Sequence, residues 1–163
     1  MQFRSRYLQA LLIVMLFACG ARLAIGAESA GAEPVNKDSA GVALKGYDPI
    51  SYFRENKPAQ GRSELEYEWM GARWFFSTAT NRDVFISDPT KYAPQYGGFC
   101  AYAVSKGHTA DINPNIWKIV DGKLYLNKNW LAGKLWQGDI PGNIAKADKN
   151  WPGIVSKRLP NRR

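Results

Sequence analysis

The sequence predicts an α+β fold, in which a small antiparallel sheet built from two hairpins has short helices packed against it. Two segments with alternating or strongly apolar side chains are each followed by a turn signal and a second apolar segment. Helical spacing of apolar residues fills the remaining segments, without the strand–helix–strand rhythm of a parallel sheet. The 163 residues are 45% hydrophobic and 13% aromatic, enough for one domain with a sizeable core.

The first hairpin is predicted from the strict alternation of residues 64–69. Leu65, Tyr67 and Trp69 fall on one face of this segment, and three glutamates fall on the other. Gly71 and Ala72 are expected to turn the chain into a second strand at residues 73–76.

The second hairpin is predicted from the Asp-Gly pair at residues 121–122, which favours a two-residue turn with positive φ at both positions. This turn joins a strand at residues 116–120 to a strand at residues 123–127. The register that it sets pairs Ile119 with Leu124 and Trp117 with Leu126 on one face, and Lys118 with Tyr125 on the other.

The helices are predicted from capping residues and apolar spacing. Ser77, Thr78 or Thr80 can cap a helix that runs to about Ser87, and Asp88 with Pro89 then begins a short helical turn reaching Tyr92. One later helix is indicated by Trp130, Leu131 and Leu135, and another by Ile140, Ile144, Ala147 and Trp151, with Pro152 ending it.

The N-terminus has the order of a secretory signal, and residues 1–27 are assigned to it. Arg4 and Arg6 precede an apolar run at residues 8–18, which small residues follow at 24–27. The run is too short for a transmembrane helix, so the protein is expected to be exported, periplasmic or secreted. As an alternative, residues 16–19 resemble a lipoprotein signal, which would leave a lipid anchor on Cys19.

The remaining chain divides by composition into a flexible linker at 28–40, a domain at 41–155 and a basic disordered tail at 156–163. Without residues 1–27 there are 19 basic and 14 acidic side chains, so the formal net charge falls from +8 to +5. Four of these positive charges lie in the tail. The domain therefore lacks the basic face that nucleic-acid binding requires.

Several segments of the domain resemble the YHS domain family in order and spacing. The matching segments are residues 46–53, 69–77, 83–85 and 88–92, and the exported, single-domain bacterial branch of the family adds residues 96–102, 120–127 and 139–143. The resemblance covers residues 41–152, and together with the predicted export it leads us to expect a binding module for a metal ion or a small ligand in the bacterial envelope. Some YHS domains bind metal through cysteines near the first hairpin, but Phe76 and Ser77 stand at the corresponding place here.

Cys100, His108 and Asp111 are the candidate metal ligands. Cys100 is the only thiol after residue 27, and His108 is the only imidazole in the chain. Thiolate, imidazole and carboxylate together suit copper or zinc. The alternative is that Cys100 is a small buried hydrophobe and His108 lies on a surface loop.

Two other function classes stay open beside the binding module. Cys100 and His108 could act as nucleophile and base of a thiol-dependent enzyme, although the chain carries no recognisable catalytic motif and we assign no catalytic residue. A protein-interaction module with no bound ligand is the third class, which exposed tryptophans would favour. For a small ligand, the candidate pocket residues are Tyr47, Asp48, Tyr52 and Tyr102, with Asp48 also able to cap the turn that begins at Pro49.

Overall fold

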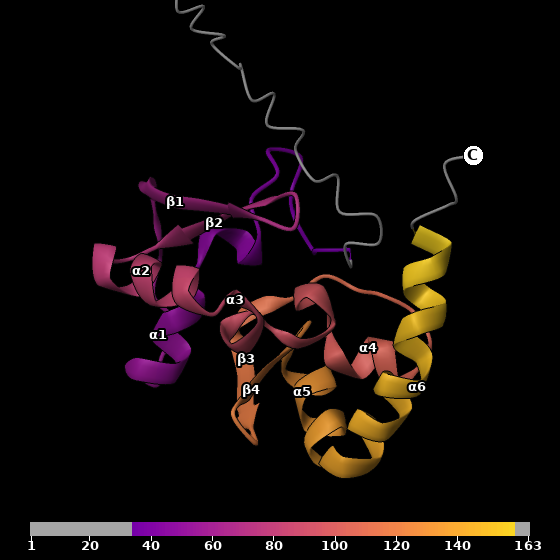
Figure 1. Ribbon diagram of the computed structural model, residues 1–163. Helices are drawn as coiled ribbons and strands as arrows, with labels where there is room; N and C mark the ends of the chain where they lie inside the picture. The colour runs from indigo at the N-terminus through magenta and orange to yellow at the C-terminus, as the bar shows by residue number, and fades with distance from the viewer. Residues whose placement is uncertain (1–33, 159–163) are drawn as a thin grey trace, which may run out of the picture. The chain divides into compact units, whose positions relative to one another are not determined.

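The computed structural model describes residues 34–158 (Figure 1). The predicted signal at residues 1–27, with Cys19, lies outside the described residues, as do residues 28–33 of the predicted linker and 159–163 of the predicted tail. Within the described range, no helix is long and apolar enough to span a membrane.

The α+β fold is confirmed, with each hairpin forming a two-stranded sheet of its own. Strand β1 (Arg62–Trp69) pairs antiparallel with β2 (Ala72–Phe76), and β3 (Asn113–Val120) pairs antiparallel with β4 (Lys123–Asn127). Eight helical segments complete the described chain: η1 (Leu44–Gly46), α1 (Pro49–Arg54), α2 (Ala79–Ser87), α3 (Pro89–Tyr92), η2 (Gln95–Gly98), α4 (Ala101–Ser105), α5 (Trp130–Gln137) and α6 (Ile140–Arg158).

The turn of the first hairpin lies one residue earlier than predicted. Trp69 pairs with Ala72, so Met70 and Gly71 form the turn, with φ values of 51° and 64°. Ala72 instead begins β2, where it pairs with Trp69 and its side chain is buried. The predicted faces of β1 are confirmed, because its glutamates are exposed and the alternating apolar residues are partly buried.

The second hairpin has the predicted register, with Ile119 opposite Leu124 and Trp117 opposite Leu126. Strand β4 is covered on both faces, as its buried residues alternate between two core clusters. Leu124 and Leu126 belong to the larger cluster, which contains Trp74 and Phe76 of β2 and Phe85 of α2. Tyr125 belongs to the smaller cluster around α4, α5 and α6. In Figure 1, β3 and β4 lie between these two groups of elements.

The predicted caps of the first helices are confirmed. Thr78 accepts a hydrogen bond from the backbone N–H of Asn81 at the start of α2, and Asp88 accepts one from Lys91 at the start of α3. Pro89 occupies the first position of α3, where its missing N–H loses no hydrogen bond.

Helix α6 continues through Pro152 to Arg158, so the prediction that Pro152 ends the helix is wrong. The buried side chains of Ala147, Trp151 and Ile154 lie on both sides of the proline and pack in the smaller cluster. This packing offsets the cost of an interior proline, about 3 kcal/mol. Residues 156–158, predicted as disordered tail, are therefore helical, and the Arg158 guanidinium lies 4.7 Å from the centroid of the Phe99 ring.

Residues 34–40, predicted as part of the flexible linker, pack against the rest of the chain. The Asn36 backbone N–H donates to the Gly97 carbonyl at 2.8 Å, and its side-chain amide donates to the Gly98 carbonyl at 3.2 Å. Gly97 has φ +59°, and a Cβ there would lie 2.0 Å from the Pro34 carbonyl oxygen, so only glycine allows this crossing. Residues 34–40 are thus part of the packed structure, which extends to the N-terminal side of Gly41.

The carboxylate of Asp48 is fully buried and accepts four hydrogen bonds. Its Oδ1 atom accepts from the Ile50 backbone N–H at 2.8 Å, which caps α1. Its Oδ2 atom accepts from the Ser77 backbone N–H at 2.9 Å, the Ser77 hydroxyl at 2.6 Å and the Asn81 side-chain amide at 2.7 Å. One side chain thereby joins the start of α1 to the end of β2 and the first turn of α2.

Replacing Asp48→Asn should lower the free energy of unfolding by about 2–4 kcal/mol. Whichever oxygen the amide NH₂ replaces, it would face the backbone N–H of Ile50 or Ser77, donor against donor. Urea unfolding measures the change, with Asp83→Asn, an exposed carboxylate on α2, as the matched control expected to stay within about 0.5 kcal/mol of wild type. Equal effects of the two substitutions would contradict the role given to Asp48.

Candidate functional site

Cys100, the first predicted metal ligand, is a core residue. It is 1% exposed and occupies the position before the first residue of α4. Its Sγ atom accepts a hydrogen bond from the Lys128 backbone N–H at 3.3 Å, and the thiol donates to Asn127 Oδ1 at 3.6 Å. The sulfur is therefore enclosed and engaged on both sides.

His108 and Asp111, unlike the buried Cys100, are exposed to solvent. His108 is exposed on the turn after α4, where its backbone N–H donates to the Ala103 carbonyl at 3.2 Å. Asp111 is exposed and forms an ion pair with Lys45 at 2.5 Å. Among residues 34–158, no three His, Cys, Asp or Glu side chains are grouped so that they could hold a metal ion. The structure thus does not assemble the predicted set of three ligands.

The ion pair with Lys45 has an electrostatic consequence for Asp111. Partial burial acts to raise the pKa of this carboxyl. Hydrogen bonds from Lys45, the Ile112 backbone and Asn36 outweigh the burial and hold the pKa below its ordinary value. The carboxylate is thus stabilised by protein donors in the absence of any metal.

The four residues predicted to line a ligand pocket have packing roles. Tyr52 is buried, donates from its hydroxyl to the Pro114 carbonyl at 3.0 Å and packs edge-on against Trp117 at 5.2 Å between ring centroids. Burial raises the pKa of Tyr52. Asp48 forms the network described above, while Tyr47 and Tyr102 are partly buried against the larger cluster. None of the four lines the cavity described next.

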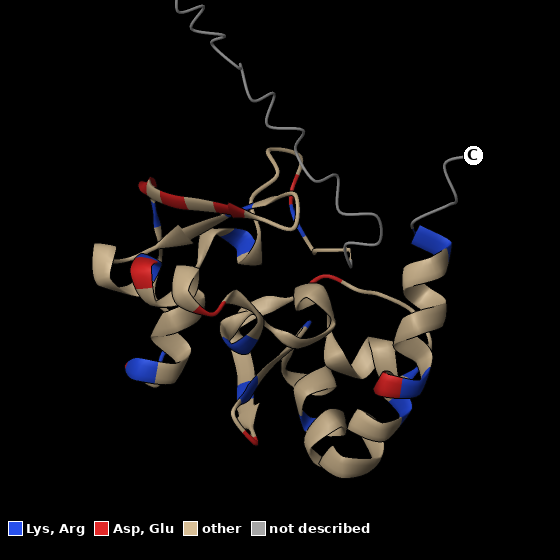
Figure 2. Ribbon diagram, viewed as in Figure 1, with Lys and Arg blue, Asp and Glu red and all other residues tan. Residues whose placement is uncertain are grey.

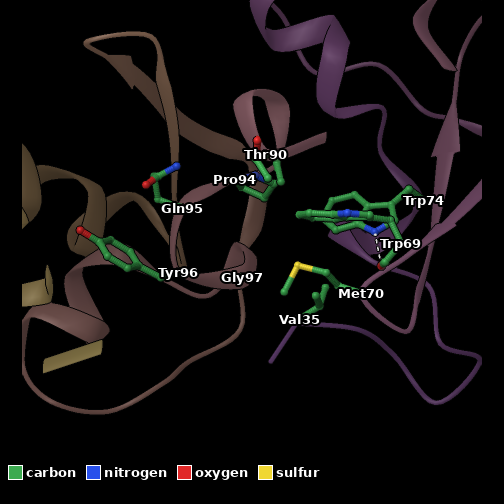
Figure 3. A pocket seen from close by; sticks show the side chains of 10 residues that line it. Val35, Trp69, Met70, Trp74, Thr90, Pro94, Gln95, Tyr96 and Gly97 are labelled. Carbon is green, nitrogen blue, oxygen red and sulfur yellow. Dashed lines mark hydrogen bonds between the residues drawn. The ribbon is translucent and has the colours of Figure 1, made fainter. Parts of the chain in front are cut away.

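A cavity of about 380 Å³ lies beside the tip of the first hairpin (Figure 3). One wall comes from β1, β2 and the turn between them, and the other from α3, η2 and the residues that join them, with Val35 added from the start of the described chain. The lining residues are Val35, Trp69, Met70, Trp74, Thr90, Ala93, Pro94, Gln95, Tyr96 and Gly97.

The hairpin wall is apolar because its polar atoms are used within the hairpin. The Trp74 indole N–H donates to the Trp69 carbonyl at 3.1 Å, as the dashed line in Figure 3 shows. Phe85 supports both indoles from behind, with ring centroids 5.8 Å from Trp69 and 5.3 Å from Trp74. Met70 projects from the turn toward Val35 (Figure 3). This wall offers indole and thioether surface to a ligand.

The opposite wall depends on two consecutive left-handed residues, Tyr96 and Gly97, with φ values of 57° and 59°. In Figure 3 the Tyr96 ring points away from the two tryptophans. Its hydroxyl donates to Asp148 at 2.8 Å, and burial together with this hydrogen bond raises the pKa of Tyr96. Thr90 and Gln95 are the other polar residues of the lining, and in Figure 3 the Gln95 side chain, like the Tyr96 ring, lies on the side away from the two tryptophans.

The side chains that line the cavity are apolar, aromatic, hydroxyl or amide in character. Its ten lining residues include no carboxylate, imidazole, thiol or amine, the groups that most often act as acids, bases or nucleophiles. The alternation of residues 64–69 predicts a buried face for Trp69 but does not connect this residue with residues 90–97. No periodic signal indicates that the hairpin tip and this later segment face each other.

Comparison of the chain with known protein families, with curated proteins and with solved structures finds no match. The resemblance to YHS domains therefore stays a prediction.

Cys100 should react slowly with iodoacetamide in the folded protein at neutral pH. Because the thiol is enclosed, alkylation requires local or global opening, and we expect a rate at least about 100-fold below that in concentrated urea. Mass spectrometry of a Cys19→Ser chain follows this single thiol. Rapid stoichiometric labelling of the folded chain would contradict the enclosed position and support thiol chemistry.

The free energy of unfolding should fall as the pH rises above about 10, the ordinary pKa of tyrosine. Tyr52 and Tyr96 keep their protons to higher pH in the folded state than in the unfolded state. Above pH 10, unfolding therefore releases protons, and each residue lowers the free energy of unfolding by up to about 1.4 kcal/mol per pH unit. Below pH 10 both residues are protonated in both states, and their full contribution to stability is present. Urea unfolding between pH 8 and about 11.5 gives the free energy of unfolding as a function of pH. It should decline less steeply in the double variant Tyr52→Phe with Tyr96→Phe than in wild type, and an equal slope in both proteins would refute this cause.

Proposed function

We propose that this protein is a binding module for a small, mostly apolar ligand held in the cavity beside the first hairpin. The observation that carries the proposal is the apolar, aromatic lining of a space of about 380 Å³. Ligand pockets commonly have volumes of about 300–1,000 Å³ and combine apolar walls with a few polar groups. The cavity fits this description in size and composition.

The lining indicates the class of ligand. Trp69 is partly exposed and offers flat indole surface, which suits an aromatic or fused-ring compound, while Trp74, 1% exposed, packs against it. Met70 can adapt its flexible side chain to the ligand's outline. The Thr90 hydroxyl can hydrogen-bond one polar substituent at the opposite wall. A ligand with a strong charge would find no counter-ion among these residues.

This proposal takes up the small-ligand form of the predicted binding module. A metal bound by Cys100, His108 and Asp111 has no support from their positions, because the thiol is enclosed and Asp111 is paired with Lys45. An exported YHS-like domain with this cavity would meet small molecules of the bacterial envelope, and we keep that location as part of the proposal.

Blocking the cavity should weaken binding of an apolar fluorescent probe. Thr90→Trp places an indole at the cavity wall, whereas Thr80→Trp places the same side chain on the exposed surface of α2, away from the cavity. With N-phenyl-1-naphthylamine, an uncharged aromatic compound, as the probe, we expect one site in wild type and about tenfold weaker binding in Thr90→Trp, because the lost contact area is worth about 1–2 kcal/mol. Fluorescence titration gives both values.

The Thr80→Trp chain should bind the probe as wild type does. Equal affinity of all three proteins, or probe binding with many weak sites, would place the probe elsewhere and contradict the proposal. Thermal unfolding of the two variants checks that both keep the fold.

A further inference from the structure

Helix α5 exposes three large hydrophobic side chains that the cavity does not use. Trp130 is 66% exposed, Leu131 57% and Leu135 47%. Only one other large hydrophobic side chain among residues 34–158, Ile86, is exposed, and it lies on α2. We call these three residues of α5 the apolar patch.

The apolar patch lies on the side of α5 opposite to the face that packs on the domain. Gly133 and Trp136 are buried on that face, and a Cβ at Gly133 would lie 2.7 Å from the Ile116 side chain of β3. At 100° per residue, the three residues of the patch lie within an arc of about 140° on the outer side of α5. The exposed side chains thus remain outside after α5 has docked fully on the domain.

Positive charge lies within and beside the apolar patch. The Lys134 side chain falls inside the same arc, and its Nζ atom is 5.9 Å from the centroid of the Trp130 ring. Lys128 is exposed just before the helix. Residues 113–158 carry eight basic and three acidic side chains, whereas residues 34–112 carry nine of each. Figure 2 shows this excess as blue segments on β3, α5 and α6.

We propose that α5 docks this protein on an anionic phospholipid surface. The apolar patch would enter the boundary between headgroups and acyl chains, while Lys128 and Lys134 contact the lipid phosphates. Tryptophan and leucine beside lysine are typical of helices that lie in this boundary, where the indole prefers the headgroup level and the lysine extends to the water.

The position of Lys134 favours a membrane over a protein partner. It lies between Trp130 and Leu131 on the outer side of the helix, so it would be at the centre of any protein interface formed by the patch. The centres of protein interfaces are depleted of lysine, because its ammonium group is costly to bury. At a bilayer the same ammonium stays among the headgroups. The proposal does not depend on the cavity, since no residue of α5 lines it.

Vesicle flotation of the full chain tests the lipid contact. Phosphatidylcholine vesicles with 30% phosphatidylglycerol should carry more wild-type protein than pure phosphatidylcholine vesicles, and high salt should reduce the difference. Leu131→Ser with Leu135→Ser should lower the partition coefficient on the anionic vesicles about tenfold. Ile86→Ser, an equivalent change on α2, should leave it unchanged, and thermal unfolding should show that both variants are folded.

Quenching of Trp130 by brominated lipid acyl chains reads the contact directly, even if another segment of the chain also binds vesicles. The difference in fluorescence between wild type and Trp130→Phe gives the share of the total emission that comes from Trp130. We expect brominated anionic vesicles to quench this share. No quenching of that share, or the same quenching of Trp130 in the α5 variant as in wild type, would overturn the proposal. If wild type self-associates, the α5 variant does not, and neither binds vesicles, the proposal is overturned in favour of a protein contact.

Discussion

The carboxylate of Asp48 accepts four hydrogen bonds inside the protein, and the geometry around the first hairpin depends on this group. No cation pairs with it among the described residues; its charge is satisfied by backbone and side-chain donors from α1, from the end of β2 and from α2. These donors can meet at one carboxylate in only one relative placement of the three elements. That placement brings Phe85 of α2 under Trp69 and Trp74, and so determines the rear of the cavity wall.

Short sequence signals, such as turn and capping residues, predict the parts of the fold that local geometry alone determines. The Asp-Gly turn set the register of β3 and β4, because its geometry determines which residues pair. The turn at Met70 was misplaced because a methionine with positive φ is uncommon and only the pairing of Ala72 requires it. Pro152 was expected to end α6, but packing on both sides of it outweighed the local cost.

The candidate site was harder to predict, since sequence spacing does not report which way a side chain points. Cys100 and His108 are eight residues apart, yet α4 lies between them, so one enters the core before the helix and the other is exposed after it. Asp48 and Tyr52 carry reactive groups that the protein uses for its own interior. The cavity comes from apolar residues of distant segments, and periodicity reports their burial but not the space they enclose.

Strand β4 is the shared wall of both core clusters, since Leu124 and Leu126 face one and Tyr125 faces the other. If the elements of either cluster separated, one face of this strand would be opened to water, and its remaining partners would lose their support. The two clusters are therefore not independent folding units. We therefore expect the amide hydrogens of β4 to be among the slowest to exchange, and the two clusters to unfold together in one cooperative event.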